Sequence, residues 1–214
     1  ELIVAASAET RVFVLAAADE LEDVDFVSWL GRHDAAIIPV DHDTPWIRDY
    51  GPLEIIDEVG RASWLDLAYH DDRPLDDALP WQLSRLAGIH VESHLLSTEG
   101  GAVASNGAGV CAMTEPSFQQ ALNYDPDDDS AQGLLEVLGC DALAVVPALS
   151  GETTGHVDVM VQFLDRNLVA VAEADHFVDP IVAAELDTAA RSISEAAAAV
   201  GQRMRIVRLP LRVD

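Results

Sequence analysis

A strand–strand–helix–strand unit recurs along this chain and limits the folds that it can adopt. Apolar runs mark the strands, and Gly, Asn and Pro mark the turns between them. Each copy is roughly sixty residues long and shares little sequence with the others, so the repetition is structural. The predicted elements are residues 53–56, 62–67, 78–88 and 90–96 in the first copy, 103–113, 130–139 and 142–146 in the second, and 156–163, 168–172, 180–201 and 205–209 in the third.

A shorter segment precedes these copies, with predicted strands at residues 12–15 and 35–40 and a helix at 17–31. Three short polar segments, which are described below and called islands, lie at junctions that open or close the units. Functional residues at matching junctions of a repeat suggest a radial α/β arrangement around a central site. The chain has 214 residues, of which 50% are hydrophobic, and this is enough for one core. We therefore expect a single domain over residues 1–214.

The charge of the chain excludes some classes of partner. The formal net charge is -26, and all twelve basic residues are arginine. Such a surface repels nucleic acid and anionic lipid, and it attracts cations. No apolar run approaches the ~20 residues of a membrane-spanning helix. We expect a cytoplasmic protein whose acidity serves solubility, for example in a high-salt cytoplasm, with steering of cationic substrates as a secondary gain.

The two cysteines are predicted to be separate, small core residues. Cys111 lies in an apolar strand-like run, and Cys140 follows a glycine at the end of a predicted helix. Two cysteines do not make a disulfide framework. The acidic residues 125–129 are predicted to form a solvated loop, because they lack the ligand spacing of a calcium loop.

The first polar island is residues 46–52, Trp-Ile-Arg-Asp-Tyr-Gly-Pro. Trp46 offers a flat apolar face and Asp49 a carboxylate, and prolines on both sides stiffen the loop. A planar cation could stack on the indole and pair with the carboxylate. The alternative is a buried tryptophan beside a structural Arg48–Asp49 ion pair, and the island alone favours neither.

The second island is Glu99-Gly100-Gly101. The two glycines allow a tight turn and a close approach of a ligand to the backbone. Glu99 would then lie at that turn. The alternative is an ordinary glycine turn without a functional role.

The third island is Gly155-His156-Val157-Asp158. On a strand that begins at His156, the side chains of His156 and Asp158 share one face, and Val157 and Val159 point into the core. A metal site of the His-x-Asp kind is the alternative, and it needs further ligands. The residues that could supply them are His42, Asp43, His70 and Asp71. The remaining histidines, expected at the surface or in the core, are His33, His90, His94 and His176.

Placed around one centre, the island side chains suit a guanidinium group. A guanidinium is planar, permanently charged and offers five donors in a fixed fork, so flanking carboxylates can bind it with paired hydrogen bonds. A histidine beside carboxylates can transfer a proton near neutral pH. A nucleophile for the guanidinium carbon is missing from the set. The set is Trp46, Asp49, Glu99, His156 and Asp158.

The three islands resemble motifs of the agmatine deiminase and bacterial-type peptidylarginine deiminase family, within the guanidine-modifying (pentein) superfamily. The order and spacing of the islands resemble that family from about residue 10 onward. The resemblance implies a five-fold α/β propeller of ββαβ modules, of which this chain would hold about three. It also implies hydrolysis of agmatine or of free or peptidyl arginine, without metal or organic cofactor. The reaction would pass through a thiouronium intermediate on a cysteine and release ammonia.

The resemblance also implies roles for the island residues. Asp49 and Asp158 would bind the guanidinium, and Trp46 would line the pocket. Glu99 would pair with the substrate or with the histidine. His156 would act first as general acid and then as the base that activates water. His156, Asp158 and Glu99 are thus the expected catalytic residues.

The chain departs from the family at the nucleophile. The family's cysteine lies in a Gly-rich segment near the C-terminus, and neither Cys111 nor Cys140 matches that position. We therefore expect a deiminase-like domain that lacks its C-terminal portion. Three explanations stay open: a fragment of a complete deiminase, a truncated relative that binds guanidinium compounds or assembles without turnover, or a site completed by a second chain. An open propeller exposes sheet edges, so a homo-oligomer is among the expected states.

Overall fold

A computed structural model describes the chain except for residues 1, 58, 123–127 and 212–214. Its elements follow the predicted repeat. The segment before the repeat holds α1 (Leu2–Ser7), β1 (Phe13–Ala16), η1 (Glu20–Glu22), α2 (Val24–Arg32), β2 (Ala36–Pro39) and α3 (Ile47–Tyr50). The first unit holds β3 (Leu53–Ile56), β4 (Ala62–Ala68), α4 (Pro74–Asp77), α5 (Leu79–Ala87) and β5 (Val91–Ser97).

A 3-10 turn, η2 (Gly100–Ala102), leads into the second unit. The second unit holds β6 (Ala104–Ser105), β7 (Val110–Thr114), α6 (Glu115–Ala121), α7 (Asp128–Leu138) and β8 (Ala142–Val146). The third unit holds β9 (Val161–Asp165), β10 (Leu168–Glu173), α8 (Pro180–Ala199) and β11 (Arg205–Pro210). None of the described helices is long and apolar enough to cross a membrane.

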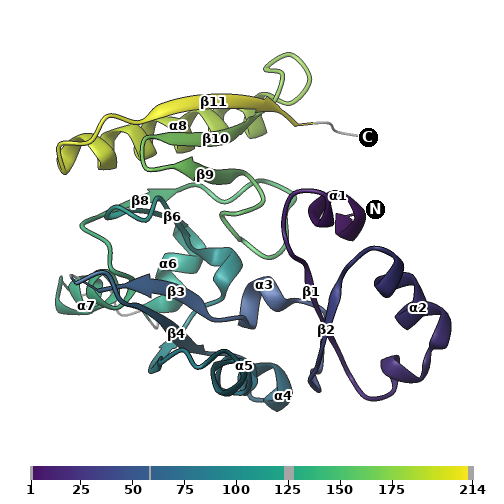
Figure 1. Ribbon diagram of the computed structural model, residues 1–214. Helices are drawn as coiled ribbons and strands as arrows, with labels where there is room; N and C mark the ends of the chain where they lie inside the picture. The colour runs from purple at the N-terminus through teal and green to yellow at the C-terminus, as the bar shows by residue number, and fades with distance from the viewer. Residues whose placement is uncertain (1, 58, 123–127, 212–214) are drawn as a thin grey trace.

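The three units share one sheet topology. In each, the first strand pairs antiparallel with the second, and the second pairs parallel with the third after a helical crossover. The sheet orders are β3-β4-β5, β6-β7-β8 and β11-β10-β9, and β1 and β2 form a separate parallel pair. Figure 1 shows α3 between the β1–β2 pair and the other sheets. The α/β class and the ββαβ units predicted from the sequence are confirmed.

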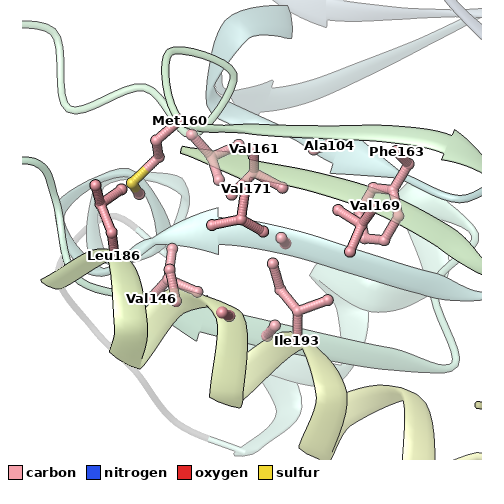
Figure 2. Packing of buried hydrophobic residues seen from close by; sticks show 14 of the residues in the cluster. Ala104, Val146, Met160, Val161, Phe163, Val169, Val171, Leu186 and Ile193 are labelled. Atoms are coloured by element: carbon pink, nitrogen blue, oxygen red, sulfur yellow. The ribbon is translucent and has the colours of Figure 1, made fainter. Parts of the chain in front are cut away.

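The largest core cluster lies between α8 and the sheets of the second and third units (Figure 2). Leu186, Ile193 and Ala197 recur along one face of α8 and are fully buried, as the helical period requires. The helix begins where Asp179 accepts a hydrogen bond from the Val182 N–H at 3.1 Å, with Pro180 in its first turn. This packing fixes the third unit, and with it the segment that leads into β9.

Two predicted elements begin later than expected. The helix predicted at residues 17–31 begins at Val24, because Asp23 caps it by accepting from the N–H groups of Asp25 and Phe26 at 3.0 Å each. The strand predicted from residue 156 begins only at Val161. Of the predicted acidic loop at 125–129, residues 125–127 lie outside the described part, and 128–129 begin α7.

The segment before β9 is a turn rather than a strand, which corrects the strand argument for the third island. The Met160 and Val161 N–H groups both donate to the Val157 carbonyl, at 3.1 and 2.9 Å. The alternation of side chains between the two faces of a strand therefore does not apply to residues 156–159. Val157 is fully buried as predicted, but Val159 is 44% exposed and does not point into the core.

The two cysteines are buried as predicted but are not separate residues. Cys111 and Cys140 form a disulfide, with their Cα atoms 5.9 Å apart. The parallel register of β7 and β8 places Val110 opposite Ala142 and Cys111 opposite Leu143. Cys140 lies just before the first residue of β8, on the side of Val110 and Cys111, where it reaches the Cys111 sulfur. The prediction of two independent core thiols is wrong.

Candidate active site

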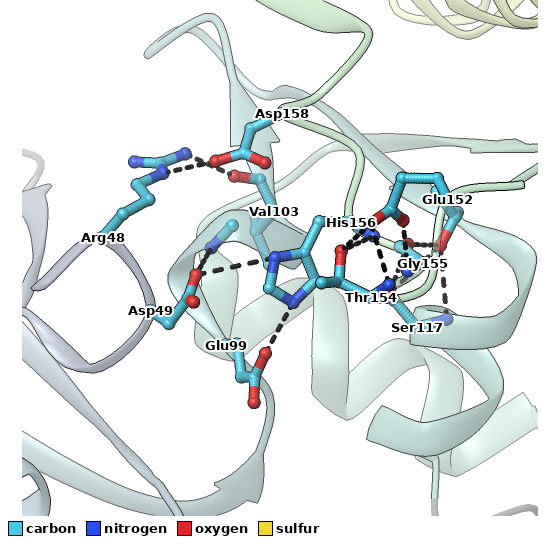
Figure 3. A network of polar contacts seen from close by, with 12 residues as sticks. Arg48, Asp49, Glu99, Val103, Ser117, Glu152, Thr154, Gly155, His156 and Asp158 are labelled. Atoms are coloured by element: carbon cyan, nitrogen blue, oxygen red, sulfur yellow. Dashed lines mark hydrogen bonds and ion pairs between the residues drawn. The ribbon is translucent and has the colours of Figure 1, made fainter. Parts of the chain in front are cut away.

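The three polar islands meet in space, although 110 residues separate Arg48 from Asp158. The first island contains the short helix α3, the second leads into η2, and the third is the turn before β9 (Figure 3). Gly100 packs so closely on α3 that a Cβ there would lie 2.1 Å from the Arg48 carbonyl oxygen. The Asp158 N–H donates to the Gly101 carbonyl at 3.2 Å. Backbone contacts through the two glycines therefore hold the islands together.

His156 lies at the centre, between two carboxylates (Figure 3). Its Nε2 is 2.5 Å from Glu99 Oε2, and its Nδ1 is 3.6 Å from Asp49 Oδ1. The histidine side chain is 9% exposed. A Cβ on Gly101 would lie 2.5 Å from His156 Nδ1 and 2.7 Å from Asp49 Oδ1. The second glycine is therefore required by the side chains of the site and not only by the turn.

Asp49 lies on α3, in surroundings that disfavour its ionised form. Its Oδ1 accepts a hydrogen bond from the Gly101 N–H at 3.3 Å. Burial raises the pKa of Asp49 above its ordinary value of 3.8, and the nearby charges of Glu99 and Asp158 raise it further. The interaction with His156 and the hydrogen bond from Gly101 lower the pKa but do not offset the rest. A cation bound at this point would relieve the repulsion.

Asp158 already holds a guanidinium group. Arg48 Nε donates to Asp158 Oδ2 at 3.1 Å, and an Arg48 terminal nitrogen donates to the Val103 carbonyl at 3.2 Å. The Arg48–Asp49 ion pair that the sequence left open is not the arrangement found. Trp46 is 60% exposed at the start of α3, so it is not a buried core residue either.

A tight turn supports His156 from the other side, and sequence reasoning missed it. Glu152 accepts from the Thr154 N–H and hydroxyl at 2.8 Å each and from the Gly155 N–H at 2.6 Å. These hydrogen bonds outweigh burial and lower the pKa of Glu152. The Gly155 carbonyl accepts from the hydroxyls of Thr114 and Ser117, and Gly155 has φ +71°. The only sequence signal was the Glu-Thr-Thr-Gly run before the histidine.

His70 also reaches the site, through the second oxygen of Glu99. His70 Nε2 lies 2.8 Å from Glu99 Oε1. Cavities of about 230 Å³ and about 100 Å³ flank the cluster, the first beside Asp158 and the second beside His70 and Glu99. From the sequence, His70 was considered only as a possible metal ligand, because no regular spacing relates it to the islands.

The metal alternative is assembled only in part. Among the described residues, Asp49, Glu99 and His156 bring ligand atoms within 4.8 Å of one another, a spacing that could hold a cation. Of these three, only His156 belongs to the metal site considered from the sequence, and two of the further ligands considered for it have other partners. Asp43 accepts from the Leu75 N–H at 2.8 Å, and His42 is 3.8 Å from Glu20. Three carboxylates around one histidine suit a planar organic cation at least as well as a metal ion.

Neither cysteine is available as a nucleophile at this site. Cys111 and Cys140 are the two cysteines of the chain, and they are joined in the disulfide. Both are buried, at 0% and 8% exposure, in the core cluster around α7. A thiolate carries the covalent step in chemistry of this kind, and the described site holds none.

Comparisons with known proteins agree on one family. The family model of the Porphyromonas-type peptidyl-arginine deiminases matches residues 1–213. A putative agmatine deiminase of Marinomonas sp. (strain MWYL1) is 26% identical over 194 residues, covering 82% of this chain and 51% of the relative. The agmatine deiminase of Pseudomonas aeruginosa (strain LESB58) is 25% identical over 195 residues, with the same shares. The chain thus spans about half the length of the curated relatives that it matches.

Solved structures show the same fold. The agmatine deiminase of Enterococcus faecalis superposes with a TM-score of 0.82 at 18% identity, covering 100% of this chain and 62% of the other. The C. jejuni agmatine deiminase superposes with a TM-score of 0.75 at 21% identity, covering 98% and 61%. The pentein-type α/β fold expected from the sequence is therefore confirmed, and no closed barrel is formed by the residues that the structure describes.

Proposed function

The chain belongs to the Porphyromonas-type peptidyl-arginine deiminase family, and we propose that it forms the guanidinium-binding and proton-transfer part of a deiminase. The observation that carries the proposal is the buried His156, held between Glu99 at 2.5 Å and Asp49 at 3.6 Å. Asp158 adds a third carboxylate, which already binds the guanidinium group of Arg48 at 3.1 Å. Carboxylates placed in this way match the donors of a substrate guanidinium.

In this proposal Asp49 and Asp158 bind the substrate. The pKa of Asp49 is raised by burial and by its like-charged neighbours, so a bound cation stabilises the ionised form. Trp46 offers its exposed indole at the start of α3 as one wall for a planar group. Arg48 holds one oxygen of Asp158, so the substrate either uses the other oxygen or displaces Arg48.

His156 transfers the protons in this proposal. Glu99 engages Nε2, so Nδ1 is the nitrogen that exchanges a proton with the reacting groups. A thiolate adds to the guanidinium carbon, His156 protonated on both ring nitrogens gives its Nδ1 proton to the departing nitrogen, and ammonia leaves. Nδ1 then takes a proton from water, whose oxygen adds to the same carbon and displaces the thiolate. The ureido product passes its remaining extra proton to ammonia, which becomes ammonium.

The thiolate has to come from outside these 214 residues, because Cys111 and Cys140 are joined to each other. We propose that either a further segment or a second chain supplies it. The same observation favours a second candidate function, in which the chain binds guanidinium compounds or assembles with other chains without turnover. An assay of ammonia release distinguishes the deiminase from the binding function without turnover.

We propose a small guanidino amine such as agmatine as the substrate. The relatives described above bear the name agmatine deiminase, and a chain with a net charge of -26 attracts a dication more strongly than a substrate with a free carboxylate. Arginine and peptidyl arginine are the substrates to compare with it. A cytoplasmic location and a homo-oligomer remain predictions, although a buried disulfide is more typical of oxidising compartments.

Calorimetric titration of the chain with agmatine tests the binding step. Heat of binding is expected for agmatine and not for 1,4-diaminobutane, which lacks the guanidinium. Asp158→Asn should remove it, whereas Asp19→Asn, the same charge change at an exposed position, should not. Equal heats for the two ligands, or none for agmatine, would contradict the proposal. Ammonia release is then assayed with agmatine, arginine and an arginyl peptide.

A further inference from the structure

The carboxylate of Glu99 is engaged on both of its oxygens by histidines. Oε2 faces His156 Nε2 at 2.5 Å, and Oε1 faces His70 Nε2 at 2.8 Å. We propose that His70 is a positioning residue, which fixes Glu99 and, through Glu99, the orientation and the tautomer of His156. This inference rests on the proposed function, because it assigns a role within the same site.

His70 is itself held firmly. Its ring packs edge-on against Tyr69, with 4.6 Å between the ring centroids, and Tyr69 packs against Tyr50 of α3 at 5.6 Å. Tyr50 is 6% exposed and donates its hydroxyl to the Thr44 carbonyl at 2.6 Å. The rings thus connect His70 to the helix that carries Asp49, so the two sides of the site are placed relative to each other.

Hydrogen bonds fix the backbone and the ring of Tyr69 next to His70. The Tyr69 N–H donates to Asp77 Oδ1 at 2.9 Å, and Arg73 donates to the Tyr69 hydroxyl at 2.9 Å. The backbone next to His70 is therefore held in place, and the Tyr69 ring limits the positions open to His70 Nε2. Such a donor orients a carboxylate better than water does, because it loses less freedom on binding.

The geometry determines which ring nitrogen of His156 carries hydrogen. An ionised carboxylate only accepts hydrogen bonds, so Glu99 requires an N–H at Nε2 of each histidine. A neutral His156 then has a free lone pair at Nδ1, the nitrogen that faces Asp49. The other charged groups at this centre are Asp158 and Arg48. With His70 in place, Glu99 would lose a second hydrogen bond if it turned away from His156.

Exposure shows why the outer contact matters. The side chain of His70 is 46% exposed, that of Glu99 24% and that of His156 9%. The cavity of about 100 Å³ beside His70 and Glu99 would admit water to Oε1 if the imidazole were absent. Water would then compete for Glu99, and the carboxylate would lose its single orientation.

A matched pair of amide variants tests the role. The amide nitrogen of His70→Gln reaches about as far as Nε2, whereas that of His70→Asn is too short to meet Glu99. The control is His94→Gln, on an exposed histidine of β5. Long-range ¹H–¹⁵N spectra report the tautomer of His156 without any ligand, and calorimetry reports the agmatine affinity.

We expect one fixed tautomer of His156 in the native chain, in His70→Gln and in His94→Gln, and averaged ring signals in His70→Asn. Agmatine should bind about tenfold more weakly to His70→Asn, because binding would then have to order the Glu99 carboxylate and the His156 ring. Native spectra and affinity in both His70 variants, or the same loss in both, would overturn the role of His70. Failure of the native chain to bind agmatine would count against the proposed function alone, because the tautomer can still be compared.

Discussion

At the scale of single residues, Asp49 shows most clearly why the site favours a cation. Its carboxylate lies near Glu99, Asp158 and one histidine, and its pKa is raised by burial first and by the like charges in addition. Taking a charge out of water is unfavourable unless an opposite charge accompanies it. Asp49 is therefore most stable in its ionised form when a cation occupies the space between the carboxylates.

The affinity for agmatine should fall in acid because of Asp49. Guanidinium binding needs the ionised carboxylate, and the raised pKa means that Asp49 takes up its proton at a higher pH than the ordinary 3.8. Affinity is thus complete above the raised pKa and is lost as the pH falls through it. Calorimetry from neutral to acidic pH should show this loss, and Asp49→Asn should bind at least about tenfold more weakly at neutral pH. If the agmatine affinity of Asp49→Asn still fell in acid as it does in the native chain, the group that takes up the proton would be another residue.

Gly101 should tolerate no side chain. A Cβ there would lie 2.5 Å from His156 Nδ1 and 2.7 Å from Asp49 Oδ1, so Gly101→Ala should weaken agmatine binding by about tenfold or more while the fold is kept. Gly133 of α7 is the matched control, because a Cβ there meets nothing within 4 Å. Gly133→Ala should leave binding unchanged and stabilise the chain by about 0.5–1 kcal/mol. Equal binding by the two variants would show that the glycine turn has no functional role.

Residue types and their order predicted the centre of the site, and only part of its surroundings. Asp49, Glu99 and His156 meet as expected, since glycine, proline and aromatic residues around them mark stiff junctions. The contact of His70 with Glu99 and the part played by Glu152 were missed, because the partners of these residues depend on the path of the chain between units. The expected arrangement of His156 and Asp158 on a strand was wrong, since hydrogen bonds to the Val157 carbonyl make a turn there.

At the scale of elements, strands bounded by clear turn signals were easier to predict than short helical turns. The strands 53–56 and 142–146 agree with the structure residue for residue, because apolar runs between turn signals leave little choice. The turns α3 and α4 have four residues each, too few for a helical period to appear. The disulfide was missed because it depends on the register between β7 and β8, which the sequence does not reveal.

The disulfide should add measurable stability to the second unit. Cys111 and Cys140 are 29 residues apart, and closing a loop of that length in the unfolded chain corresponds to roughly 3–4 kcal/mol. Urea unfolding of the chain with both Cys111→Ala and Cys140→Ala should show a loss of this order. The same loss is expected for the native chain in excess dithiothreitol. If neither treatment moves the unfolding midpoint, the bond makes no contribution to stability.

At the scale of the whole molecule, the net charge, rather than the packing of the core, determines how the chain responds to salt. The chain carries 38 acidic and 12 basic residues, so its surface repels itself at low ionic strength. Salt reduces that repulsion, because the screening length falls from about 10 Å at 0.1 M to about 3 Å at 1 M. The same screening weakens the attraction of a cationic substrate.

Salt should therefore move stability and binding in opposite directions. Between 0.1 and 1 M NaCl we expect the urea midpoint of unfolding to rise and the affinity for agmatine to fall. Both can be measured on the same preparation by circular dichroism and calorimetry. A urea midpoint that stays level or falls with salt would show that self-repulsion does not limit the stability of this chain.

The central claim is that the three islands form a guanidinium site, and a crystal structure of the chain with agmatine tests it most directly. We predict the guanidinium group between the carboxylates of Asp49 and Asp158, with its carbon facing Nδ1 of His156. Agmatine bound elsewhere, or these carboxylates without ligand at saturating agmatine, would contradict the claim.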